Sequence, residues 1–136
     1  MRVFKIVRDI GNLRFTKGSD SLVVTQFDSG CSLSFELLDH QKPMDLKGCQ
    51  AIIVFKNQET GIEWGEKVAI RQPLSLTSSP VLTYELNRTE EAGEYVGILT
   101  LIDVHGCQVS TAPFVLTVLP HLTTQEKLQH YWGIEA

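Results

Sequence analysis

The sequence predicts an all-β domain, built as an antiparallel sandwich, with a short C-terminal helix. Apolar and polar residues alternate at a period of two through most of the chain, which is typical of half-buried strands. Turns rich in Gly, Asp and Pro separate the apolar runs roughly every eight to fifteen residues, as in sandwiches and barrels. Only the last stretch of the chain has the apolar spacing of a helix.

Length and composition indicate one globular domain. The chain has 136 residues, of which 43% are hydrophobic and 21% charged, and its net charge is −4. This charge gives no basic surface for nucleic acid or an anionic membrane. No segment approaches the ~20 apolar residues that span a bilayer, and the N-terminus lacks the apolar run of a signal peptide. We expect a sandwich over residues 1–120, a helical appendage over 121–136, and synthesis in a reducing cytoplasm.

The first half of the chain contains two clear alternating patterns. Residues 31–37 (CSLSFEL) place apolar side chains on one face and polar ones on the other, which predicts a half-buried strand. Residues 49–56 (CQAIIVFK) are apolar on both faces, which favours a central strand. Upstream, 2–7 and 21–27 are candidate strands, with 13–15 (LRF) as a candidate short third.

The second half continues the pattern. Residues 66–72 and 80–86 predict two shorter strands, 94–104 the longest strand and 107–119 the next. Proline cannot donate a hydrogen bond to a neighbouring strand. Pro113 therefore predicts an edge strand or a bulge, at which the chain changes its sheet neighbours.

The stretch NRTEEAGEY predicts a corner before the longest strand. Asn87 and Glu90 have the spacing of a helix cap, so we expect one helical turn, and Gly93 then reverses the chain with a positive φ. In immunoglobulin-like sandwiches a tyrosine at the place of Tyr95 sends its hydroxyl to upstream backbone. The sequence thus predicts an immunoglobulin-like antiparallel β-sandwich. Gly97 stands where an antibody domain has its second cysteine.

Cysteines and histidines give no sign of a metal centre or of thiol catalysis. Zinc ligands occur in closely spaced pairs. Only His105 and Cys107 are so closely spaced, and they belong to a predicted hairpin turn. Cys31, Cys49 and Cys107 cannot all pair within one chain, and free cysteines are usually buried. We therefore expect three reduced thiols on apolar strand faces, no cofactor, no metal and no enzymatic activity.

Two aromatic residues suggest an alternative function. Trp64 and Tyr84 lie in or beside predicted strands. Exposed aromatic rings on a β-sandwich can stack on sugars, so these residues are candidates for saccharide binding. The competing interpretation for Trp64 is that it covers the edge of the core.

The C-terminal stretch LTTQEKLQHYWGI predicts a helix of about two turns. Thr123 and Glu126 have the spacing of a capping box. Leu128, Tyr131 and Trp132 then fall on one face. A helix this short is not stable alone in water, so its apolar stripe must be covered, either by its own sandwich or by another subunit.

Four short motifs follow one another in the order seen in a phage protein family. They are D-S-G at 28–30, K-P-M-D-L-K-G at 42–48, A-G-E-Y at 92–95 and S-T-A-P-F at 110–114. With the strands between them, they resemble the N-terminal domain of phage baseplate upper proteins over residues 20–119. Many relatives continue into a helical linker and further domains, whereas this chain ends soon after residue 120.

This resemblance implies an immunoglobulin-like sandwich that serves as a structural adaptor in a phage or prophage tail. Such an adaptor links receptor-binding or accessory proteins to the central baseplate. The expected location is the virion tail, and the expected partners are other baseplate or tail proteins, or further copies of the chain itself. The corner Asn87, Gly93 and Tyr95 is then structural, and Leu128, Tyr131 and Trp132 are the candidate interface.

Overall fold

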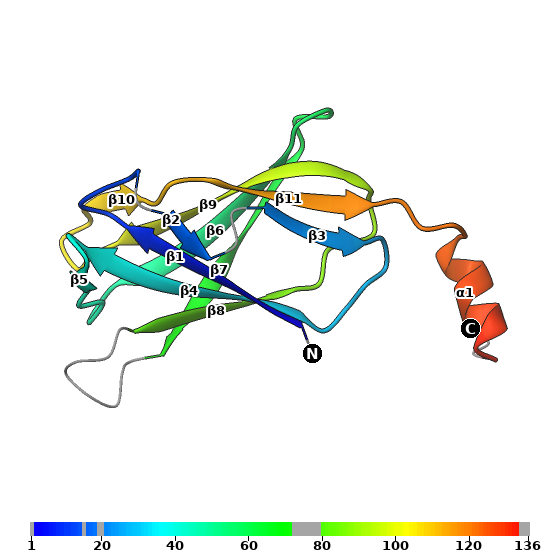
Figure 1. The fold of residues 1–136 in the computed structure, drawn as a ribbon, viewed down its shortest axis with the longest axis horizontal. Helices are drawn as coiled ribbons and strands as arrows, with labels where there is room; N and C mark the ends of the chain where they lie inside the picture. Colours follow the sequence, from blue (N-terminus) through cyan, green and yellow to red (C-terminus); the bar gives the residue numbers. More distant parts are fainter. Residues whose placement is uncertain (1, 15, 19–20, 72–79, 134–136) are drawn as a thin grey trace.

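The computed structural model describes residues 2–14, 16–18, 21–71 and 80–133. The fold is all-β with one short helix at its C-terminal end (Figure 1), which confirms the predicted class. The elements are β1 (Arg2–Asp9), β2 (Thr16–Gly18), β3 (Ser21–Thr25), β4 (Cys31–Asp39), β5 (Lys42–Pro43), β6 (Gln50–Asn57), β7 (Glu63–Arg71), β8 (Val81–Leu86), β9 (Gly93–Ile102), β10 (Gln108–Ser110), β11 (Phe114–Leu119) and α1 (Gln125–Tyr131).

One continuous hydrogen-bonded path joins nearly all strands, in the order β2-β1-β4-β8-β7-β6-β9-β11-β3. The path folds into two layers because β7 is shared. Its first part, Glu63 to Val68, pairs with β6, and its last part, Ala69 to Arg71, pairs with β8. The result is a sandwich that is nearly closed into a barrel. Most pairs are antiparallel, whereas β1 with β4 and β3 with β11 are parallel.

The core follows from the alternation seen in the sequence. On β4, Cys31, Leu33, Phe35 and Leu37 are all buried, as the pattern predicts. The equivalent inward positions of β6, β8, β9 and β11 complete one apolar cluster. The edges of the two layers meet near Arg2, whose guanidinium Nη2 donates to the carbonyl oxygen of Val23 on β3 at 2.8 Å.

Three predicted elements differ from the structure. Leu13 and Arg14 lie in a turn, and the rest of the predicted strand at 13–15 falls outside the described residues. The 107–119 strand is broken into β10 and β11, as Pro113 predicts, but both parts pair with β9. Ser110 lies opposite Thr100 and Phe114 opposite Gly97. One extra residue is therefore accommodated as a bulge, and the chain keeps its neighbour.

The third difference concerns the predicted helical turn at 87–92, which is irregular loop in the structure, so Asn87 caps no helix. Thr89 explains why. Its hydroxyl donates to the carbonyl oxygen of Asp28 at 2.7 Å, and its own carbonyl accepts from the backbone N–H of Phe27. These bonds tie the loop to the β3–β4 connection and take the place of helical bonds.

Candidate interaction surfaces

The corner at the start of β9 is held by Tyr95. Its side chain is only 6% exposed, and its hydroxyl donates to the carbonyl oxygen of Glu91 at 2.8 Å. Burial raises the pKa of Tyr95 above its ordinary value, and a hydrogen bond with Asn57 offsets only part of this rise. Gly93 has a φ of +150°, a conformation that side chains disfavour. The structure thus places Gly93 and Tyr95 together at the corner, whereas Asn87 is exposed.

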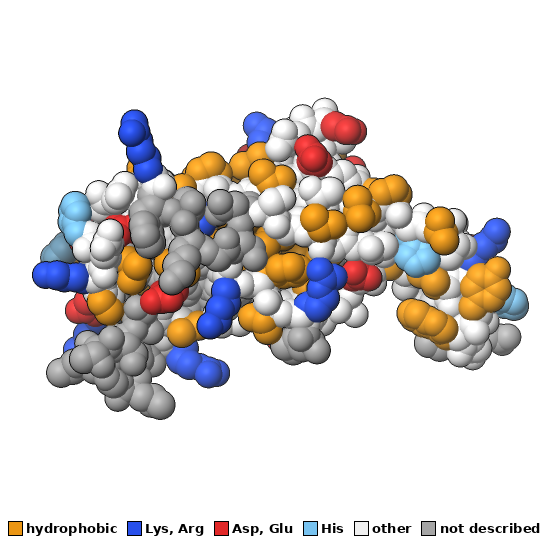
Figure 2. All heavy atoms as spheres, viewed as in Figure 1, with side chains coloured by type: hydrophobic (Ala, Val, Ile, Leu, Met, Phe, Trp, Pro, Cys, Tyr) orange, Lys and Arg blue, Asp and Glu red, His pale blue; other side chains and the backbone are white. Residues whose placement is uncertain are grey.

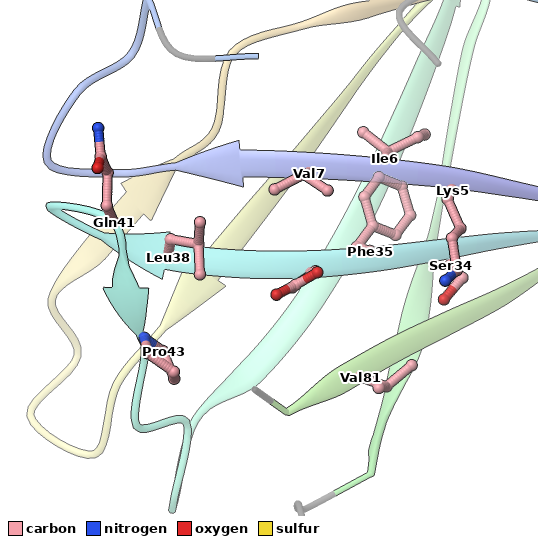
Figure 3. A pocket seen from close by; sticks show the side chains of 10 residues that line it. Lys5, Ile6, Val7, Ser34, Phe35, Leu38, Gln41, Pro43 and Val81 are labelled. Carbon is pink, nitrogen blue, oxygen red and sulfur yellow. The ribbon is translucent and has the colours of Figure 1, made fainter. Parts of the chain in front are cut away.

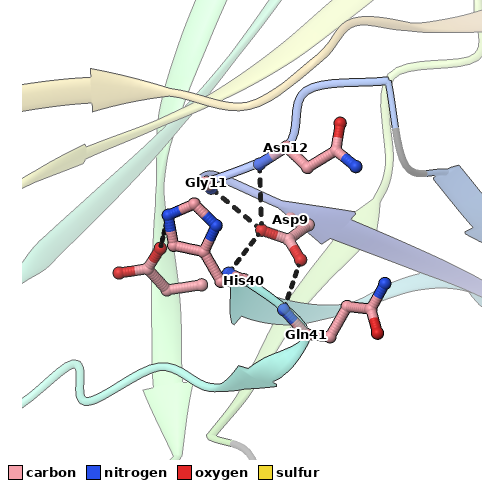
Figure 4. Close-up of polar contacts among 6 residues, drawn as sticks. Asp9, Gly11, Asn12, His40 and Gln41 are labelled. Carbon is pink, nitrogen blue, oxygen red and sulfur yellow. Dashed lines mark hydrogen bonds and ion pairs between the residues drawn. The ribbon is translucent and has the colours of Figure 1, made fainter.

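A second hydrogen-bonded centre surrounds Asp9 at the end of β1 (Figure 4). Its carboxylate accepts four backbone N–H bonds, from Gly11, Asn12, His40 and Gln41, at 2.6 to 3.1 Å. Burial raises the pKa of Asp9, but the four donors outweigh it and hold the pKa below its ordinary value. Asp9 therefore joins the loop after β1 to the β4–β5 turn.

The β4–β5 turn needs this support because of its backbone. His40 and Gln41 have φ values of +50° and +66°, the conformation of a tight hairpin turn that usually contains Asn and Gly. Sequence reasoning missed Asp9, whose only local signal is the D-x-G-N pattern at 9–12. Its partners at 40 and 41 are distant in sequence.

Trp64 and Tyr84 belong to an aromatic cluster that covers one edge of the core. The Trp64 ring packs 4.5 Å from Phe55, and the Arg88 guanidinium lies 5.0 Å above the Trp64 ring. Arg88 is held there by Glu66, at 3.0 Å. Tyr84 is only 4% exposed, and burial, together with Glu66, raises its pKa well above its usual value.

This packing leaves Tyr84 without an open ring face for a sugar, and Trp64 lies between Phe55 and Arg88. The adjoining hollow, lined by Asn57, Trp64, Arg88 and Tyr95 among others, has a volume of about 220 Å³. Ligand pockets usually measure roughly 300–1,000 Å³. The geometry therefore agrees with the core-edge interpretation of Trp64, and it places Tyr84 in the core itself.

A groove of about 520 Å³ runs along β1, β4 and β8 (Figure 3). Lys5, Ser34 and Val81 line one end, and Gln41 and Pro43 the other. Its lining mixes one amine, one carboxylate and apolar side chains. Within the described ranges, no group of three or more His, Cys, Asp or Glu side chains is placed to hold a metal ion.

The cysteines differ in their surroundings. All three are free thiols; Cys31 is buried in β4 and Cys49 is half-buried beside the core. Cys107 is exposed, which corrects the expectation that it lies on an apolar strand face. It sits in the β9–β10 turn, where the Asp103 carboxylate accepts the backbone N–H groups of His105 and Cys107. His105 is thus part of a hairpin turn.

The helix α1 stands away from the barrel, beyond the end of β11 (Figure 1). None of its residues is buried, and Tyr131 and Trp132 are 73% and 68% exposed. Within the stripe, Leu128 is half-buried, whereas Tyr131 and Trp132 are not covered by the described part of the sandwich. The cap also differs by one residue from the prediction, since Thr124, rather than Thr123, accepts from the Lys127 N–H.

The described helix is too short and too polar to cross a membrane.

No protein-family profile and no curated protein sequence matches the chain. Among solved structures, the fold is similar to the "N-terminal domain of phage TP901-1 ORF48", with a TM-score of 0.60 and 15% sequence identity. The match covers 88% of this chain and 99% of that one. A domain of the same fold thus occurs at the N-terminus of a phage protein.

Proposed function

We propose that the chain is a structural adaptor of a phage or prophage tail baseplate, which links receptor-binding or accessory proteins to the central baseplate. The observation that carries the proposal is the fold match to nearly the whole N-terminal domain of a phage protein. The ordered motifs at 28–30, 42–48, 92–95 and 110–114 support it independently. In this proposal the protein acts in the virion through its surfaces and performs no reaction.

The structural positions of the motifs give further support. The 42–48 motif includes β5, which follows the turn held by Asp9; 92–95 is the tyrosine corner; and 110–114 is the bulge. Each motif therefore falls where the backbone departs from a regular strand. A resemblance at these places concerns the architecture and not a reaction centre, as expected of an assembly module.

The test is removal of the gene from the phage or prophage that carries it, followed by electron microscopy of the tail tips. We expect tails that lack their distal appendages and recover them when the gene is supplied again. The purified chain should also co-elute with at least one baseplate protein encoded nearby. Tails that remain complete without the gene would contradict the proposal.

A titration with host wall polysaccharide serves as the control for the carbohydrate-binding alternative. We expect no binding, because Tyr84 is buried and the Trp64 ring is covered by Arg88. Tight saccharide binding that Trp64→Ala abolishes would instead favour direct contact with the cell surface.

A further inference from the structure

The outer face of the layer formed by β6, β9, β11 and β3 is unusually apolar. Inward side chains of these strands fill the core. Several of their outward side chains are apolar as well, with Thr100 and Thr117 among the polar ones between them. We call this surface the outer patch; it consists of Val23, Ile52, Val54, Val96, Ile98 and Val115. These side chains are only partly buried, and Val23 is 43% exposed.

The strand register makes the outer patch continuous. Val54 lies opposite Ile98 on the neighbouring strand, and Val96 lies opposite Val115. Side chains opposite each other on one face of a sheet are in contact range. Hydrophobic side chains are visible over β3 and β11 in Figure 2. Charged residues, including Lys56, Lys67 and Glu94, lie at the ends and sides of the outer patch.

The layer that contains β4 and β8 has a more polar outer face, which serves as a comparison. Outward positions of β4 and β8 include Ser34, Glu36, Thr83 and Glu85. An antiparallel sheet with one face in water commonly alternates in this way, and β6 and β9 do not. Large apolar patches on a protein surface mark interaction sites, so the outer patch is a candidate interaction surface.

The second uncovered apolar surface is the stripe on α1. A helix of seven residues does not persist alone in water, and its exposed Tyr131 and Trp132 are residue types enriched at binding hot spots. Leu119 and Leu122, both exposed, continue the apolar surface from β11 toward the helix. The molecule thus has an apolar patch on the sheet and an apolar stripe on the helix, and neither is covered by other described residues.

Contacts in the connection keep α1 away from its own sheet. The His121 N–H donates to Gln26 Oε1 at 3.2 Å, and its ring lies 6.0 Å from that of Phe27. The Thr123 N–H in turn donates to His121 Nδ1 at 3.1 Å. These bonds tie the start of the connection to the β3–β4 loop and direct the helix outward. With these contacts in place the helix points away from its own sheet (Figure 1), so docking on another copy requires no change in them.

We propose that α1 of one copy docks on the outer patch of a second copy, with the stripe Leu128, Tyr131 and Trp132 against the sheet. Reciprocal docking covers both surfaces of both copies and closes the assembly as a twofold dimer. The border of the outer patch carries charges of both signs, Lys56 and Glu94, and α1 likewise carries both signs, on Glu126 and Lys127. This proposal concerns contacts between copies and does not depend on a phage partner.

The mass of the full chain, measured by sedimentation across the micromolar to millimolar range, tests the dimer. Val54→Lys in the outer patch and Trp132→Ala on α1 should each weaken dimerisation by about tenfold or more. Thr83→Lys, on the outer face of the other layer, is the matched control and should leave it unchanged. Trp132→Ala keeps the test valid even if Val54→Lys affects folding, because Trp132 is exposed outside the barrel.

A photo-crosslinking residue at position 132 identifies the docking surface. In a mixture of ordinary and isotope-labelled chains, crosslinks should join one chain to peptides of the other that contain Ile52 and Val54, or Val96 and Ile98. A monomer at all concentrations, a dimer insensitive to both variants, or crosslinks within one chain only would overturn the proposal. A mass that grows beyond the dimer would overturn the closed twofold arrangement.

Discussion

Gly97 leaves the space in which two aromatic rings meet. A Cβ atom at this position would lie 2.5 Å from the Phe114 ring and 2.8 Å from the Phe55 ring. The two rings are in edge-to-face contact, with their centroids 5.6 Å apart. Aromatic packing therefore fills the core at the place where an antibody domain has its inter-sheet disulfide, and it requires a residue without a side chain.

Gly97→Ala should lower the free energy of unfolding by about 1–3 kcal/mol, the usual effect of an extra methyl group in a packed core. Urea unfolding measures this change. Gly65→Ala, on the outward face of β7, is the control and should have a smaller effect. Its Cβ would meet methyl groups of Val54 and Ile52 and the Ile53 carbonyl oxygen at 3.3 to 4.0 Å. Adding Phe114→Leu to Gly97→Ala should recover part of the loss. Wild-type stability of Gly97→Ala would contradict the close packing.

Tyr95→Phe should lower the free energy of unfolding by about 1–3 kcal/mol, because the hydroxyl bond to the Glu91 carbonyl is partly buried. Tyr131→Phe serves as the control, since the Tyr131 side chain is largely exposed. Thermal unfolding of the two variants distinguishes the positions. Equal melting temperatures of Tyr95→Phe and Tyr131→Phe would show that the corner does not depend on the hydrogen bond from the Tyr95 hydroxyl.

At the scale of single elements, the β4–β5 turn depends on one carboxylate. Asp9→Asn should lower the melting temperature near neutral pH, because the ionised form accepts the four backbone N–H groups best. The folded pKa lies below the ordinary value of 3.8. The charge therefore stabilises the fold above that value, and the stabilisation is lost as the pH falls through the lowered folded pKa.

The melting temperatures of the wild type and Asp9→Asn should accordingly converge in acid, below pH 3.8. Asp45→Asn is a suitable control, because the exposed Asp45 accepts a single local N–H, from Lys47. A difference in melting temperature between the wild type and Asp9→Asn that does not change with pH would argue against an ionised Asp9 in the turn.

Local patterns predicted the elements, and distant contacts decided what the sequence did not reveal. The alternation in β4 and β9 and the break at Pro113 are visible within a few residues, so they could be found. The loop at 87–92 has a helix-like spacing, but Thr89 bonds to Asp28 across the structure. The role of Asp9 likewise depends on the N–H groups of His40 and Gln41, which come near it only after β1 and β4 have paired.

The candidate sites, too, could be predicted where the signal is local and were missed where distant contacts decide. Trp64 and Tyr84 are aromatic residues whose exposure depends on Phe55, Arg88 and the rest of the cluster, which the sequence does not order in space. The outer patch was visible in part, since residues 49–56 are apolar on both faces. That observation was interpreted as a sign of a central strand, and only the register showed that four strands share one apolar face.

For the molecule as a whole, the cysteines provide a measure of which regions open. Iodoacetamide should label Cys107 first, because it is exposed. Cys49 should react more slowly, since burial and the nearby Asp103 and Asp45 carboxylates raise its pKa and only the thiolate is reactive. Cys31 should react only when the barrel unfolds.

Mass spectrometry of the native and the denatured, unreduced protein checks this order. Denaturant should make all three thiols available without a reductant. Fewer than three labelled thiols would reveal a disulfide, and labelling of Cys31 as fast as Cys107 would show that β4 is not held in a closed core.

The position of β3 at the end of the strand path has a consequence for synthesis on the ribosome. Among the described strands, β3 pairs only with β11, although β11 is the last strand to be made. A nascent chain that has not yet reached Phe114 therefore exposes β3 with its hydrogen-bonding groups unpaired. The barrel can close only after β11 has been made, so chains stalled before β11 should be bound by chaperones, whereas those released after Leu119 should not.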